Sequence, residues 1–132
     1  MDKGVSGPLT VGGWCLACPM AEALEEWSED EVLAEAEAWA ETIREGETEL
    51  LRLAYQWAVL HSPDRLDPAE TALPGREQAR RYGGEGTPEV SEFAAAEQGA
   101  RIGRSPFAAA QLMADSLDLH HRHPQLLSLI HI

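Results

Sequence analysis

Two cysteines three residues apart are the first candidates for chemistry. Cys15 and Cys18 form a C-x-x-C pair, which in thiol redox proteins follows a strand and opens a helix. No alternation of strand and helix patterns surrounds this pair, and a structural zinc would need two further ligands at suitable spacing. The sequence therefore favours two ordinary thiols over a redox or zinc site.

Three histidines form the second candidate. His120, His121 and His123 surround Arg122, but adjacent histidines point in different directions on a helix, and no carboxylate stands at a suitable partner position. Imidazoles at the C-terminal end of a helix suit the negative end of its dipole. We interpret the cluster as a helix end, and we expect neither a metal site nor any other cofactor in this chain.

A glycine-rich stretch forms the third candidate. Three glycines lie within residues 83–86, yet no Lys-Ser or Lys-Thr follows, and Glu85 would repel a phosphate. We expect a turn-rich loop rather than a phosphate loop. Arg80 and Arg81 just before it are candidate anion contacts.

The fourth candidate is a helix-turn-helix-like pair, a motif with a known way of binding DNA. Its helices are expected at about 92–102 and 105–121. Gly103 is a good residue to end the first helix, and Ser105 with Pro106 a good start for the second. In such motifs the start of the second helix reaches base edges, and Arg and Gln pair with guanine and adenine. The candidate DNA contacts are Arg101, Arg104, Ser105 and Gln111.

Two carboxylates argue against DNA recognition by this pair. Asp115 and Asp118 lie in the second helix and would face phosphates unfavourably. A helical hairpin that only packs is therefore the alternative. No nucleophile with a paired base and no pair of acids on a common face is visible, so we expect no catalytic residue.

A long amphipathic helix is predicted over about 29–61. Ser28 and Glu31 match a capping box, and two interleaved heptad series indicate a packed helical surface. Gly46 on this surface would let a partner backbone come close. The main members of this packing seam are Val32, Trp39, Ile43, Leu50, Leu53 and Trp57.

The face opposite the seam is rich in glutamate. We interpret it as a solvated face, with a docking helix for a basic partner helix as the alternative. Residues 1–27 read as an irregular arm and 62–91 as a Pro- and Gly-rich loop. The predicted fold class is all-α: one long helix, a loop and a short helical pair within a domain at about 28–126.

Composition limits the function classes. The chain has 132 residues, a length that indicates one domain. Its net charge of −13 excludes a strongly cationic nucleic-acid binder. Residues 1–64 carry a net charge of −11 and residues 65–132 a net charge of −2. An anionic ligand would therefore bind to the second half of the chain. With two cysteines, no signal peptide and no membrane span in the sequence, we expect a cytoplasmic protein.

Two segments resemble a known family. The stretches RRYGGEGTPEVSEFAAAEQGA at 80–100 and ADSLDLHHRHP at 114–124 resemble the domain of unknown function 222 family, the N-terminal helical domain of actinobacterial HNH-endonuclease-like proteins. The resemblance covers about residues 31–126. It implies a non-catalytic module that engages DNA, or packs against downstream helices or the nuclease domain of the same protein. The divalent metal and the catalytic residues of the family belong to that downstream domain.

Residues 127–132 look like a non-native tail, because family members continue into further helices. We therefore expect a fragment that is native to about Leu126, whose packing seam lacks its natural partner and favours association. One alternative is a stand-alone helix-turn-helix-like regulatory module that binds DNA or protein. Another is a small redox or metal protein built on Cys15 and Cys18.

Overall fold

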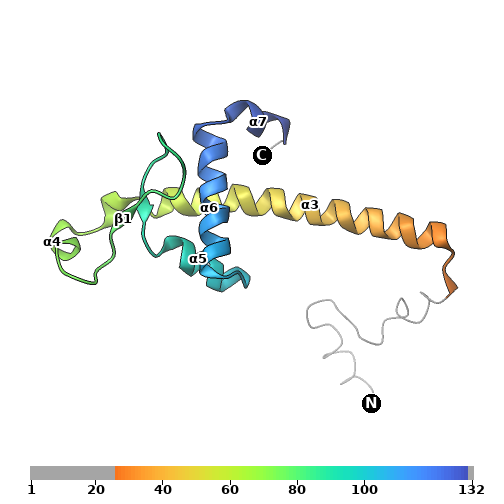
Figure 1. Ribbon diagram of the computed structural model, residues 1–132, viewed down its shortest axis with the longest axis horizontal. Coiled ribbons are helices and arrows are strands. Elements are labelled where there is room, and N and C mark those ends of the chain that lie inside the picture. The colour runs from red at the N-terminus through yellow and green to blue at the C-terminus, as the bar shows by residue number, and fades with distance from the viewer. Residues whose placement is uncertain (1–25, 131–132) are drawn as a thin grey trace, which may run out of the picture. The chain divides into compact units, whose positions relative to one another are not determined.

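The computed structural model describes residues 26–130 of the chain, and they are mostly helical (Figure 1). By internal contacts the chain divides into two units, residues 1–43 and 44–132. The elements are helices α3 (Glu29–Leu60), α4 (Pro68–Thr71), α5 (Ala94–Ile102), α6 (Pro106–His121) and α7 (Pro124–Leu129), the 3-10 turn η3 (Pro63–Arg65), and strands β1 (Ala79–Arg80) and β2 (Val90–Ser91). The all-α prediction is confirmed. The C-x-x-C pair and most of the predicted arm lie outside the described residues.

Helix α3 begins at the predicted capping box. The Ser28 amide donates to Glu31 Oε2 at 2.7 Å, and the Glu31 amide donates to Ser28 Oγ at 3.3 Å. The bonds that Glu31 accepts from the Ser28 amide and hydroxyl lower the pKa of its carboxyl group. The ionised carboxylate therefore sits where the helix dipole favours negative charge.

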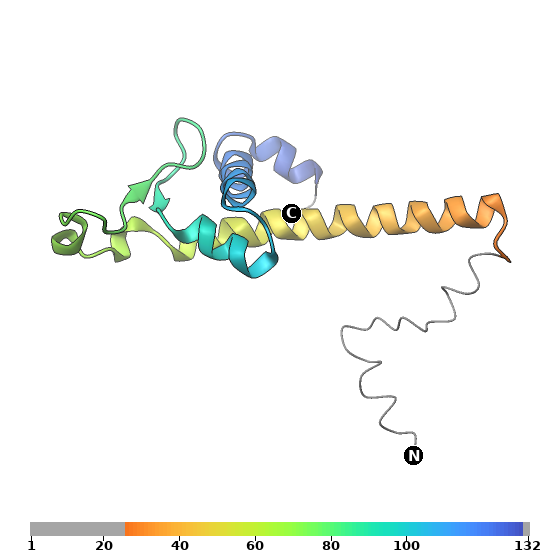
Figure 2. The same ribbon diagram turned by 60° about the horizontal axis from the view of Figure 1, so that its bottom comes forward.

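The core of the second unit is small and rich in alanine. It joins Ala58 of α3, Val90 of β2, Ala94 and Ala95 of α5, and Met113 and Leu117 of α6. Helix α6 crosses the C-terminal part of α3, with α5 beside it (Figures 1 and 2). Small side chains on α3 and α5 let these helices approach closely, which compensates for the few large apolar residues.

The predicted packing seam on α3 is not a packed surface at most of its positions. Leu50 and Trp57 are half-buried, whereas the other four seam residues are 45–60% exposed: Val32, Trp39, Ile43 and Leu53. The buried residues of α3 are Ala54 and Ala58. The heptad pattern did not predict their burial, because alanine is only weakly hydrophobic. Its small size nevertheless suits close packing between helices.

Residues 62–91 were predicted as a loop, which the structure corrects. The Asp67 carboxylate starts α4 by accepting from the Ala69 amide at 2.9 Å. Strands β1 and β2 pair antiparallel, with Arg80 opposite Val90. The Ser91 amide donates to the His61 carbonyl at 2.8 Å, which links β2 to the end of α3. One-turn helices and two-residue strands are too short to produce a periodic pattern, so the sequence did not predict them.

The hairpin of α5 and α6 is built as its local sequence predicts. Gly103 ends α5 in the left-handed conformation at φ 73°, and Ser105 Oγ accepts from the Ala108 amide at 3.1 Å. A Cβ atom at Gly99 would lie 2.6 Å from Ala109 Cβ, so the helices meet there. At Gly46, where we expected the close approach, no described atom lies within 4 Å of such a Cβ.

Helix α7 is an element that the sequence did not predict. Pro124 occupies the first turn of α7, a position where its missing N–H costs nothing. The helix includes residues 127–129, which fall in the predicted non-native tail.

Candidate functional site

The four predicted DNA contacts lie on the α5–α6 hairpin, and two of them have partners within it. Ser105 Oγ caps α6, and Gln111 Nε2 donates to Asp115 Oδ1 at 2.9 Å. Arg101 is exposed and Arg104 is half-buried. The two arginines therefore remain as candidates for an anion contact on the hairpin.

The outer face of α6 is chemically mixed. Its inner face is buried through Ala109, Leu112, Met113, Ser116 and Leu117. Phe107, Gln111 and Asp115 are exposed and spaced four residues apart, so they share one face. Phe107 is 82% exposed, although its side chain is as apolar as those on the buried face. A carboxylate on this face disfavours contact with phosphates.

The glycine-rich loop binds a carboxylate of its own chain. The Gly84 amide donates to Asp118 Oδ1 at 2.7 Å, and Thr87 Oγ1 donates to the Gly84 carbonyl at 2.7 Å. Arg122 Nη1 lies 3.4 Å from the same Asp118 oxygen. From the sequence, Asp118 was interpreted as a carboxylate that disfavours DNA binding. Its observed contact instead fixes the 83–87 loop to α6.

Replacement of Asp118 by alanine is expected to loosen this loop and to lower the free energy of unfolding by about 1 kcal/mol. The Gly84 amide loses a charged acceptor, and partial exposure of the carboxylate keeps the loss modest. Hydrogen exchange at the Gly84 amide, with urea unfolding, measures both effects. Asp115→Ala is the matched control, since Asp115 is exposed and accepts from Gln111 on its own helix. Equal exchange in the two variants would contradict the assignment.

The histidine cluster lies at the end of α6, as expected, and it also packs. The His120 ring stacks on Tyr55 of α3, with ring centroids 3.6 Å apart and planes 3° from parallel. His120 Nδ1 lies 3.0 Å from the Ser116 carbonyl oxygen. Among residues 26–130, no three His, Cys, Asp or Glu side chains are grouped to hold a metal ion. His120 therefore helps to join α6 to α3.

The candidate anion contacts Arg80 and Arg81 differ in their surroundings. The Arg80 guanidinium lies 4.8 Å from the centroid of the Tyr82 ring, a cation–π arrangement, while Arg81 is exposed. The Tyr82 hydroxyl donates to the Glu92 carbonyl, and burial raises the pKa of this phenol. Arg80 thus helps to hold the β1–β2 hairpin beside Tyr82.

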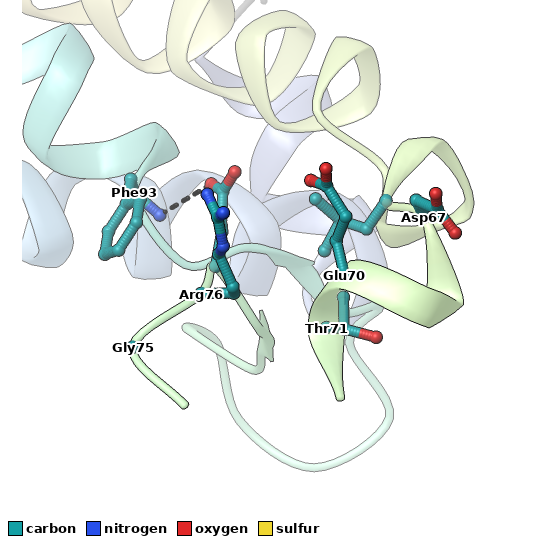
Figure 3. A pocket seen from close by; sticks show the side chains of 8 residues that line it. Asp67, Glu70, Thr71, Gly75, Arg76 and Phe93 are labelled. Carbon is teal, nitrogen blue, oxygen red and sulfur yellow. Dashed lines mark hydrogen bonds between the residues drawn. The ribbon is translucent and has the colours of Figure 1, made fainter. Parts of the chain in front are cut away.

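A pocket of about 260 Å³ lies on α4 and the following turn (Figure 3). Arg76 and Phe93 line one side of it, and Asp67 and Glu70 line the other. Two of its carboxylates already have backbone partners: Asp67 caps α4, and Glu77 Oε1 accepts from the Phe93 amide at 3.0 Å. The pocket is smaller than most ligand sites, and the carboxylates of Asp67 and Glu77 stabilise the backbone around it. No sequence pattern predicted this pocket, because its walls come from segments without a motif.

No helix within residues 26–130 is both long enough and apolar enough to cross a membrane. Comparison of the chain with protein families, curated proteins and solved structures found no match.

Proposed function

We propose that this chain is a non-catalytic helical packing domain, corresponding to the N-terminal domain of an HNH-endonuclease-like protein. The family part of the proposal rests on the resemblance of residues 80–100 and 114–124. The observation that carries the packing role is the α5–α6 hairpin. Two of its four base-reading candidates, Ser105 and Gln111, are hydrogen-bonded within the hairpin itself. The outer face of α6 also carries an acid where a DNA reader needs neutral or basic groups.

DNA engagement is the rival role, and it depends on Arg101 and Arg104. Binding of a fluorescently labelled DNA duplex at low salt, followed by anisotropy, separates the two roles. We expect that the chain shows no salt-dependent binding to the duplex, because its net charge of −13 repels the phosphate backbone. The Arg101→Ala/Arg104→Ala variant is therefore expected to give the same anisotropy as the unchanged chain. Salt-dependent binding that this double variant abolishes would overturn the packing role and support DNA engagement.

The family assignment has a separate test in the gene. We expect the reading frame to continue past the Leu126 codon into further helices and a His-Asn-His-type motif. A stop codon directly after the Ile132 codon would instead favour a stand-alone binding module.

A further inference from the structure

We propose that the first half of α3 binds an amphipathic helix whose apolar stripe is flanked by lysine and arginine. The surface consists of Val32, Ala36, Trp39 and Ile43, which we call the α3 stripe. This inference rests on the proposed packing function and names the chemistry of the partner.

The α3 stripe has the spacing of a helix-packing surface. Its residues follow one another at intervals of four, three and four, which places them on one helix face. Val32, Trp39 and Ile43 are 45%, 46% and 60% exposed. Ala36 lies between the larger side chains, and its small size leaves room for a side chain of a facing helix. Exposure of three large apolar residues in one line is typical of a surface that another protein covers.

The indole of Trp39 is held in place before any partner arrives. Its Nε1 donates to Glu35 Oε1 at 2.9 Å, one turn earlier on the same helix. A fixed tryptophan loses little conformational entropy on binding, and tryptophan is among the residues that dominate interface energetics. Trp39 is therefore the expected anchor of the interface.

The charge nearest to the α3 stripe is negative. By helical spacing, the charged residues closest to the stripe are Glu29 and Glu35, and both are acidic. Glu37, Glu41 and Arg44 lie further round the helix. A second copy of this chain, DNA and an anionic membrane are all repelled by such a surface. A helix with basic flanks is attracted to it, and complementary charge mainly sets specificity and association rate while apolar burial supplies affinity.

The test uses the full 132-residue chain and two labelled synthetic helical peptides. Both peptides carry leucine in a heptad stripe; one has lysine at the flanking positions and the other has glutamate. We expect the lysine peptide to bind at least about tenfold more tightly at low salt, with the difference shrinking as salt screens the charges. Equal binding of the two peptides would overturn the proposed partner chemistry.

Two double variants locate the site. Val32→Ser/Ile43→Ser removes two apolar side chains of the α3 stripe and is expected to weaken lysine-peptide binding about tenfold or more. Val59→Ser/Leu60→Ser is the matched control, with side chains 50% and 41% exposed near the other end of α3, and its expected change is below about twofold. Circular dichroism checks that both variants keep their helices. Equal weakening in both variants would overturn the proposed site.

A third variant separates charge from structure. Glu35→Gln removes one charge but keeps an oxygen that accepts from the Trp39 indole, so a small loss of affinity that disappears at high salt is expected. An unchanged affinity at low salt would contradict the electrostatic part of the proposal. Peptide binding and DNA binding are scored independently. Failure of the peptide with no DNA binding refutes this inference alone, whereas arginine-dependent DNA binding refutes the packing function.

Discussion

Replacement of Met113 by alanine is expected to lower the free energy of unfolding by about 2–5 kcal/mol, among the largest effects of any single side chain. Met113 is fully buried and belongs to the cluster that joins α3, β2, α5 and α6. Its neighbours there include four small or medium side chains, Ala58, Ala94, Ala95 and Val90, which cannot expand to fill the cavity. Urea unfolding followed by far-ultraviolet circular dichroism measures the loss.

Phe107→Ala is the matched control on the same helix. Phenylalanine is the more hydrophobic residue, so composition alone predicts the larger loss for this variant. Phe107 is 82% exposed, and the structure therefore predicts a change within about 0.5 kcal/mol. Equal losses for the two variants, or a larger loss for Phe107→Ala, would mean that α6 packs through its other face.

Local sequence predicted those parts of the fold that local chemistry determines. The start of α3 depends on Ser28 and Glu31, three residues apart. The turn between α5 and α6 depends on Gly103 and Ser105, which are two residues apart. Each of these signals needs one hydrogen bond or one backbone conformation within a few residues. Such signals do not depend on tertiary contacts, so the sequence contains them completely.

Contacts between distant segments were not predictable in the same way. Gly84 and Asp118 are 34 residues apart, and Trp57 Nε1 donates at 2.8 Å to the carbonyl of Ala94, 37 residues away. The sequence showed no pattern that pairs these residues. For the candidate site, it identified Arg101 and Arg104 by type but could not show that Gln111 is bonded to Asp115.

Replacement by alanine is expected to change the free energy of unfolding in opposite directions at Gly99 and at Gly46. Both glycines lie inside helices, where alanine is intrinsically favoured by about 0.5–1 kcal/mol. Gly46→Ala is expected to stabilise the protein by that amount, since no described atom lies within 4 Å of the new Cβ. Gly99→Ala is expected to destabilise it by about 1–3 kcal/mol, as overpacking does in other cores.

The reason for the reversal is the contact between α5 and α6. A Cβ at Gly99 would lie 2.6 Å from Ala109 Cβ and 3.1 Å from the Arg104 carbonyl oxygen. One of these neighbours is backbone and the other is fixed on α6, so neither can move aside as the end of a flexible side chain would. Urea unfolding of the variants Gly99→Ala, Ala109→Gly and their combination forms a double-mutant cycle. Because Ala109→Gly makes room for the added methyl group, a favourable coupling energy is expected, and independent effects would show that the helices do not meet at this point.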